Sequence, residues 1–148
     1  MVHLPAWLLK FIPNPTKFYL DRRTRVIQAG NAFRATVLAE LSGLYPIPDR
    51  WPKGTGIEPT LKSKFAALQT AVETYKPFLS KDKQAEFEEA WVTYFCALKG
   101  RREQTYHHYM NITSTSVNSF GGETMLPNDG KATFKRNVDR LLSFAQDK

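Results

Sequence analysis

Two adjacent histidines, His107 and His108, have side chains that suit chemistry, because imidazole binds metal ions and exchanges protons near neutral pH. Neighbouring side chains point about 100° apart on a helix and to opposite faces of a strand, so one ion cannot easily take both. The third histidine, His3, lies near the N-terminus, and the chain has no His-Glu-x-x-His or Cys-x-x-Cys spacing. The sequence therefore predicts no metal site and no cofactor.

Covalent catalysis would need an activated nucleophile, and the single cysteine, Cys96, follows Phe95 beside the apolar face of a predicted helix. A cysteine buried in such a place behaves as a small hydrophobic residue. The chain has no Gly-x-Ser-x-Gly elbow, no P-loop and no Gly-x-Gly-x-x-Gly phosphate loop, and the carboxylates between Glu86 and Glu89 have no histidine at a matching helical spacing. We therefore predict that the protein is not an enzyme.

Aromatic side chains outside the regular helical pattern are the better candidates for function, because exposed aromatic residues are enriched at protein interfaces. The stretch from Tyr106 to Tyr109 reads Tyr-His-His-Tyr, and core packing alone does not explain it. Together with two N-terminal aromatic residues and one later residue, the candidate partner surface consists of Trp7, Phe11, Tyr106, His107, His108, Tyr109 and Phe120.

The chain is also basic, with 21 lysine and arginine residues against 14 aspartate and glutamate residues, a formal net charge of +7. The excess is concentrated near the two ends of the chain, and the two clusters would merge if the first and last helices lay side by side. Such a surface attracts phosphate backbones, whereas the alternative is that basic residues simply solvate the outer faces of helices. The candidate basic patch consists of Arg22, Arg23, Arg25, Lys135, Arg136 and Arg140.

Four helices must position these groups, because apolar residues repeat with the period of 3.6 residues that is typical of a helix with one buried face. We expect helices over residues 17–44, 59–76, 81–99 and 131–145. A chain of 148 residues fits one domain and hardly two. The sequence thus predicts an all-α, single-domain bundle of four main helices, with a core of Phe33, Val37, Leu41, Leu61, Phe65, Leu68, Val72, Phe87, Trp91, Phe95, Val138 and Leu141.

Prolines and glycines divide the chain into an N-terminal segment over residues 1–15 and a bundle domain over residues 16–148. Trp51 and Ile57 indicate that the proline-rich connector after the first helix packs on the body. Gly30 lies on the apolar face of the first helix and favours close approach of another helix.

A long irregular insertion precedes the last helix, at about residues 103–130, where serine, threonine, asparagine and glycine predominate. At its start, Tyr106, Tyr109 and Met110 fall at helical i, i+3 and i+4 spacing. We therefore expect residues 106–112 to be ordered and packed against the third helix.

The N-terminal segment contains a short apolar run over residues 4–12, in which Trp7, Leu8, Phe11 and Ile12 share one narrow face. A segment of this kind folds back on its own core, docks on a partner or lies on a membrane surface. It is shorter than the roughly 18 apolar residues that span a membrane, and it lacks the flanks of a signal peptide. We expect a cytoplasmic protein.

Several stretches occur in an order that resembles a group of small bacterial proteins of uncharacterised function, whose members share three short motifs. The resemblance covers roughly residues 22 to 145. It implies a bacterial source and a helical fold but carries no assigned activity, so no functional residue can be transferred. The motifs here are Asn31-Ala32-Phe33-Arg34, Ala90-Trp91 with Tyr94, and Asn137-Val138 with Leu141-Leu142.

These observations lead us to expect a non-catalytic protein-interaction or assembly module, either an accessory subunit or a self-associating bundle. The alternative is a basic nucleic-acid-binding protein that acts non-specifically through its terminal helices, since no helix-turn-helix spacing or aromatic RNA-binding strand supports sequence readout. Peripheral membrane contact through residues 4–12 is a further alternative.

Overall fold

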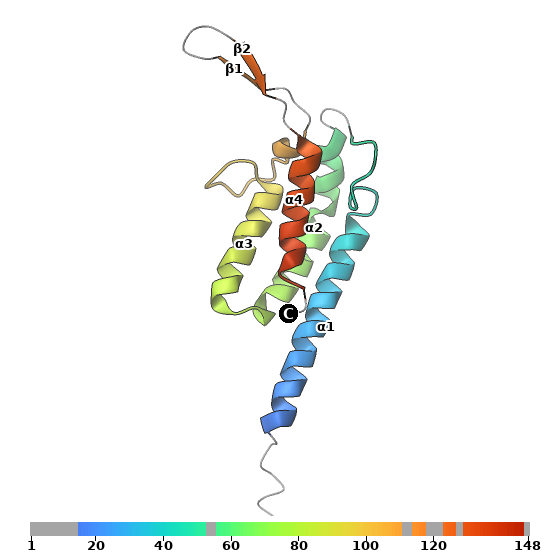
Figure 1. Ribbon diagram of the computed structural model, residues 1–148, viewed down its shortest axis with the longest axis vertical. Coiled ribbons are helices and arrows are strands. Elements are labelled where there is room, and N and C mark those ends of the chain that lie inside the picture. Colours follow the sequence, from blue (N-terminus) through green and yellow to red (C-terminus); the bar gives the residue numbers. More distant parts are fainter. Residues whose placement is uncertain (1–14, 53–55, 111–113, 118–122, 127–128, 147–148) are drawn as a thin grey trace, which may run out of the picture.

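The computed structural model describes residues 15–52, 56–110, 114–117, 123–126 and 129–146. Its body consists of helices α1 (Pro15–Glu40), α2 (Ile57–Tyr75), α3 (Lys81–Phe95) and α4 (Gly130–Ser143). Two short 3-10 turns, η3 (Lys76–Phe78) and η4 (His107–Tyr109), follow α2 and α3. The helices lie roughly alongside one another, with α1 against α2 and α3 against α4 (Figure 1). The predicted all-α bundle of four main helices is confirmed.

The insertion before α4 contains two short strands that we did not predict. Strands β1 (Ser114–Val117) and β2 (Glu123–Leu126) pair antiparallel, with Ser114 opposite Leu126 and Val117 opposite Glu123. The hairpin stands away from the helices at the end of the bundle where α4 begins (Figure 1). The expectation of irregular structure is therefore wrong for these strands. We based it on the polar composition of the insertion, but threonine, one of its common residues, favours strands.

Two helices end earlier than the sequence pattern predicts. Helix α1 stops at Glu40 instead of residue 44, and the chain turns at Gly43, whose φ of +87° lies in the left-handed region that favours glycine. Helix α3 stops at Phe95 instead of residue 99, although Gly100 also has a positive φ of +79°. Past the end of α1 the apolar pattern continues because Leu41 and Leu44 still pack on the bundle, whereas Leu98 beyond α3 is 45% exposed.

The predicted core is buried except for Phe65, which is only partly buried. Phe65 still packs against two core rings, at centroid distances of 5.5 Å from Trp91 and 5.3 Å from Phe95. Phe33 of α1 stacks on Tyr75 of α2 at 5.0 Å and meets Phe87 of α3 at 5.4 Å. Large rings therefore join three of the helices in one continuous core.

The connector and the contact between α1 and α4 agree with the sequence. Ile57 is fully buried, and the Trp51 ring packs on Phe134 at 5.1 Å. Arg34 of α1 donates to the carbonyl of Leu142 at 3.4 Å, in the last turn of α4. Gly30 is buried beside Ala145, just past the end of α4, but at a distance that leaves room for a Cβ, so the packing here does not require glycine.

Gly30→Ala is expected to stabilise the protein, whereas Gly130→Ala is expected to destabilise it. A Cβ at Gly30 would lie 3.5 Å from the carbonyl oxygen of Ala145, an ordinary contact, so alanine gains about 0.5–1 kcal/mol from its helix preference. A Cβ at Gly130 would overlap the backbone carbonyl of Tyr109, which costs about 1–3 kcal/mol. Urea unfolding of both variants measures the two changes, and equal effects would contradict this packing.

Candidate interaction surface on helix α1

The Tyr-His-His-Tyr stretch binds the end of α3, where the last carbonyls of a helix have no partner inside the helix. His108 Nε2 lies 2.9 Å from the carbonyl oxygen of Thr93, and the Tyr109 hydroxyl donates to the carbonyl of Tyr94 at 2.7 Å. The backbone N–H groups of Thr105 and Tyr106 donate to the carbonyl of Phe95 at 3.0 and 3.3 Å. The stretch therefore terminates α3, which explains why that helix ends at Phe95.

This geometry corrects part of the candidate partner surface. Tyr106 and Tyr109 are completely buried, His108 is partly buried against the Tyr109 ring at a centroid distance of 3.9 Å, and only His107 is exposed. Residues 106–110 are ordered against α3 as predicted. Trp7, Phe11, Phe120 and residues 111–112 lie outside the described residues.

Tyr109 joins two further parts of the chain at this point, the connector and α4. Its carbonyl accepts from Trp51 Nε1 at 3.0 Å, and its hydroxyl accepts from Asn137 Nδ2 of α4 at 2.9 Å. Burial raises the pKa of the Tyr109 phenol, as it does for Tyr94 and Tyr106, so all three are neutral at physiological pH. A neutral, hydrogen-bonded ring at the centre of a core acts as a structural element.

His108 is also held neutral by its surroundings. Burial lowers its pKa below the usual 6.5, and the positive charges of Arg136 and of protonated His107 act in the same direction. The hydrogen bonds to the carbonyls of Thr93 and Tyr94 oppose this shift without cancelling it. Because Nε2 donates to a carbonyl, Nδ1 carries the lone pair, and it is buried without a hydrogen-bond partner among the described residues.

The described residues offer little for metal or covalent chemistry. Within the described ranges, no three histidine, cysteine, aspartate or glutamate side chains gather where they could hold a metal ion. Cys96 is buried as predicted, and its Sγ lies 3.3 Å from the carbonyl oxygen of Leu98. No helix in the described part of the chain has the length and apolar character needed to cross a membrane.

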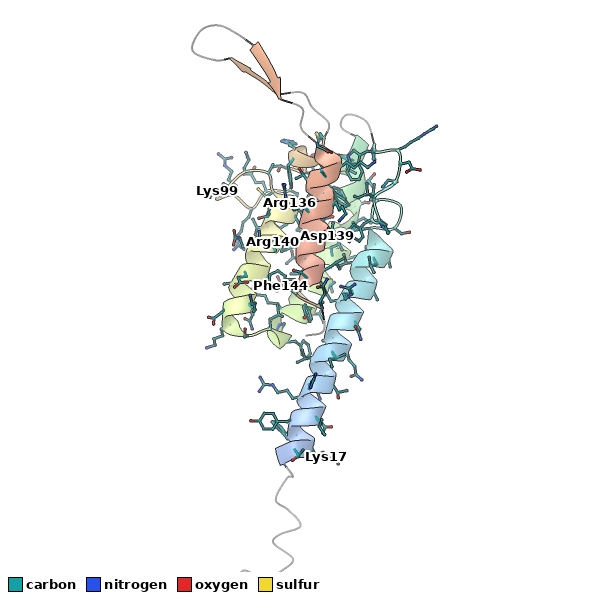
Figure 2. All side chains as sticks on the ribbon, viewed as in Figure 1. Lys17, Lys99, Arg136, Asp139, Arg140 and Phe144 are labelled. Atoms are coloured by element: carbon teal, nitrogen blue, oxygen red, sulfur yellow. The ribbon has the colours of Figure 1, made fainter. Side chains whose placement is uncertain are left out.

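The two halves of the candidate basic patch do not merge. Lys135 and Arg136 belong to the first half of α4, whereas Arg23 of α1 borders a hollow beside Phe144 and Gln146, beyond the other end of α4. Figure 2 shows Arg136 nearer the start of α4 than Arg140, with Lys17 at the far end of α1. In α4, Lys135 pairs with Asp139 at 2.5 Å and Arg140 with Glu89 at 3.5 Å.

The first half of α1 is a projection, defined here as residues 15–27, that sequence reasoning did not single out. Helix α1 has 26 residues and α4 has 14, so α1 is longer by about 18 Å at a rise of 1.5 Å per residue, and its N-terminal half extends beyond the bundle (Figure 1). Phe18, Tyr19 and Leu20 are 66%, 73% and 61% exposed. The available signal was that these bulky residues precede Val26, where the buried apolar pattern begins.

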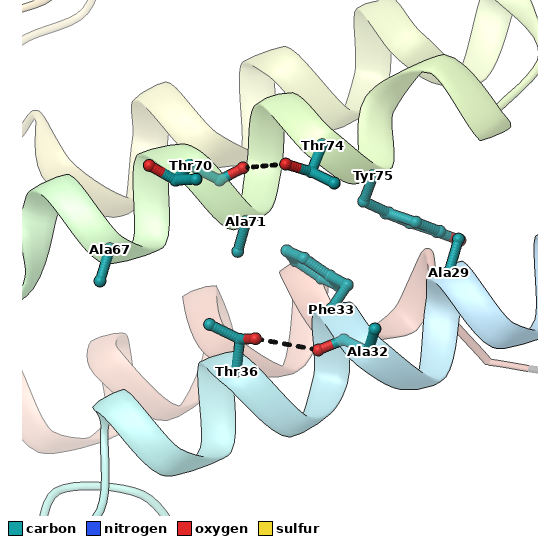
Figure 3. Close-up of a pocket in the computed structure, with 9 residues that line it drawn as sticks. All are labelled: Ala29, Ala32, Phe33, Thr36, Ala67, Thr70, Ala71, Thr74 and Tyr75. Carbon is teal, nitrogen blue, oxygen red and sulfur yellow. Dashed lines mark hydrogen bonds between the residues drawn. The ribbon is translucent and has the colours of Figure 1, made fainter.

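A groove between α1 and α2 continues from this projection along the side of the bundle (Figure 3). Its volume is about 220 Å³, and the rings of Phe33 and Tyr75 form its floor. Small side chains form its walls: Ala29, Ala32 and Thr36 of α1, and Ala67, Thr70, Ala71 and Thr74 of α2.

The threonines do not make this groove polar. The Thr36 hydroxyl donates to the carbonyl of Ala32 at 3.0 Å, that of Thr70 to Ala66 at 2.9 Å, and that of Thr74 to Thr70 at 2.7 Å. Each hydroxyl is therefore satisfied within its own helix, and two of the bonds are visible in Figure 3. Covering the groove with another molecule would leave none of these three donors unpaired.

Comparison with known proteins identifies no relative, since no family model, no curated protein and no solved structure matches the chain. The resemblance to small bacterial helical proteins stays a prediction.

His108→Gln is expected to remove a pH dependence of stability. The unfolded chain binds a proton on His108 near pH 6.5 and the folded chain only at lower pH, so the free energy of unfolding decreases as the pH falls below 6.5. Glutamine keeps a donor for the Thr93 carbonyl but does not titrate. Urea unfolding between pH 7.5 and 5.0 measures the slope, His107→Gln is the control that retains it, and an unchanged slope in His108→Gln would refute the assignment.

Proposed function

We propose that the protein is a non-catalytic protein-interaction or assembly module, an accessory subunit or a self-associating bundle, that presents the projection of α1 to a protein partner. The observation that carries this proposal is the exposure of Phe18, Tyr19 and Leu20 on a helix that extends beyond its own bundle. These side chains point about 100° apart around the helix, so apolar surface is exposed on several of its sides, and exposed apolar surface favours association with another molecule. A cytoplasmic location and a bacterial source are part of the proposal.

The proposal replaces the surface that the sequence suggested. Tyr106 and Tyr109 satisfy the end of α3 and are buried, so they are not accessible to a partner. The projection exposes aromatic rings and arginines, residue types that contribute much of the binding energy at the centres of interfaces. It also exposes Leu20, although leucine contributes less often at such centres. Contact through Trp7, Phe11 or Phe120, and membrane contact through residues 4–12, stay predictions because those residues lie outside the described ranges.

Replacing Phe18, Tyr19 and Leu20 together by serine is expected to abolish association without unfolding the protein. All three side chains are mostly exposed, so each change alters the free energy of unfolding by about 0.5 kcal/mol or less. Self-association is measured by sedimentation equilibrium, and binding of other proteins by affinity capture from an extract of the source cells.

The matched control for this experiment removes an exposed apolar side chain elsewhere on the surface. Leu98→Ser changes a residue that is 45% exposed and precedes Lys99, which lies at the other end of the bundle from the projection (Figure 2). The control should associate like the unmodified protein. Equal association of the triple-serine variant and the unmodified protein would contradict the proposed function.

Non-specific nucleic-acid binding is the second candidate, favoured by one observation on the same projection. Arg22, Arg23 and Arg25 are all exposed, and within the described ranges none of them forms an ion pair, unlike Lys135 and Arg140 of α4. Unpaired surface arginines can neutralise phosphates and release their counterions.

Salt distinguishes this candidate from an apolar interface. If three phosphates are neutralised, binding to a random-sequence DNA duplex should weaken roughly 40-fold between 50 and 200 mM salt, measured by fluorescence anisotropy. Arg22→Ala, Arg23→Ala and Arg25→Ala together should then abolish binding, whereas Lys135→Ala with Arg140→Ala should reduce it less. DNA retained at physiological salt and lost in the triple variant would replace the protein-interaction proposal, and absence of binding at 50 mM salt would eliminate the nucleic-acid candidate.

A further inference from the structure

We infer that the partner of the projection is a second copy of this chain, and that two α1 helices pack antiparallel so that the projection of each lies in the α1–α2 groove of the other. This inference deepens the proposed function and rests on it.

One face of α1 has a spacing that reads the same in both directions. Its residues follow one another at intervals of four, three, four, three and four, which keeps them on one face of a helix. Large side chains occupy the N-terminal half of this face, and small side chains that line the groove occupy the other half. In chain order the face consists of Phe18, Arg22, Arg25, Ala29, Ala32 and Thr36.

An antiparallel second copy therefore meets this face in register, large side chain against small. Phe18 lies opposite Thr36 of the second copy, Arg22 opposite Ala32 and Arg25 opposite Ala29. The same three contacts recur with the copies exchanged, as a two-fold symmetric interface requires. Each large side chain of one α1 thus lies opposite a small side chain of the other α1. The same face of the helix therefore supplies both sides of the interface.

The groove can accept the ring of Phe18. Its volume is about 220 Å³, and a cavity of about 150 Å³ already holds benzene in a protein interior. Its floor is aromatic and the hydroxyls of its threonines are satisfied, so a ring entering there displaces water from carbon surface. The stems of Arg22 and Arg25 can lie over the two alanines while their guanidinium groups stay in water.

The area of such a contact agrees with a weak but specific dimer. A helix of 26 residues is about 39 Å long and about 10 Å wide. Where the projection of one copy lies in the groove of the other, the contact spans both α1 and α2 and is about two helices wide. The two copies together would bury roughly 1,200 Å², at the lower end of specific protein interfaces. In this arrangement Phe18 is exposed in the monomer and becomes buried when the dimer forms.

Charge supplies a signature that separates this dimer from nucleic-acid binding. The arginines of the two copies approach one another near the two-fold axis. There, Arg25 of one copy and Arg25 of the other are separated by about 6 Å along the helix axis. Added salt screens this repulsion, so the dimer should tighten as salt is raised from 50 to 500 mM. Binding to phosphates would weaken over the same range.

Cysteine cross-linking tests the register directly. Arg22→Cys with Ala32→Cys places two thiols about 15 Å apart on one helix, beyond the reach of a disulfide within one chain, but opposite each other between two antiparallel copies. Under mild oxidation this variant should form a covalent dimer with two bridges, seen on non-reducing gels and by mass spectrometry. Cys96 is buried and is retained in every variant.

Arg23→Cys with Asn31→Cys is the matched control, because these exposed residues have the same midpoint on α1 but lie on the opposite face. We expect at least tenfold less covalent dimer in the control. No dimer from the first pair, or equal dimer from both pairs, would overturn the proposed arrangement.

A non-covalent measurement keeps the outcome independent of disulfide chemistry. Phe18→Ala, which removes the ring, and Ala71→Glu, which places a charge in the groove, should each weaken dimerisation at least tenfold in sedimentation equilibrium, with unchanged circular dichroism. If neither changes a measured dimer, or if no dimer forms at 1 mM protein, the second copy is the wrong partner. The proposed function then still stands provided that the triple-serine variant loses a captured protein, and it fails as well if nothing is lost.

Discussion

The carbonyl groups at the end of α3 impose the constraint on which the rest of the bundle depends. A buried carbonyl left without a donor costs about 1–3 kcal/mol, and α3 ends with carbonyls that its own backbone does not satisfy. His108, Tyr109 and the backbone of residues 105–106 supply the donors, and Asn137 reaches the Thr93 carbonyl from α4 at 3.4 Å. Trp51 then joins the connector to the Tyr109 carbonyl. One helix end thereby holds the connector, η4 and α4 in place.

Helix α1 is subject to two different constraints along its length. Its C-terminal half contributes Phe33 and Val37 to the core and is held against α4 by Arg34. Its first turns extend beyond the bundle, where residues 16–25 are exposed, and only Val26 and Ile27 at the end of this half are partly buried. The first half of the helix is thus free to carry residues chosen for another surface, which is why function is sought there and not among the buried aromatic residues.

Electrostatics follows the same division. Two cations of α4 pair with carboxylates, Lys135 with Asp139 of the same helix and Arg140 with Glu89 of α3, and Asp139 also accepts from the Tyr45 hydroxyl. Hydrogen bonds from Lys135 and Tyr45 hold the pKa of Asp139 below its usual range, so this carboxylate stays charged at neutral pH. Lys135 and Arg140 are therefore partly neutralised by carboxylates, whereas Arg22, Arg23 and Arg25 of the projection form no ion pair within the described ranges.

The sequence by itself determined the four helices and most of the core, because the 3.6-residue period of apolar residues reports which face of each helix is buried. It also indicated that Trp51 packs on the core and that Ile57 is buried. Only the tertiary structure decided the roles of Tyr106 and Tyr109, since hydrogen bonds to the end of another helix leave no periodic signal in the chain. The exposure of Phe18 could not be predicted either, because the residue pattern of a helix is similar whether or not other helices pack beside it. The lengths of the neighbouring helices determine which part of α1 extends beyond them.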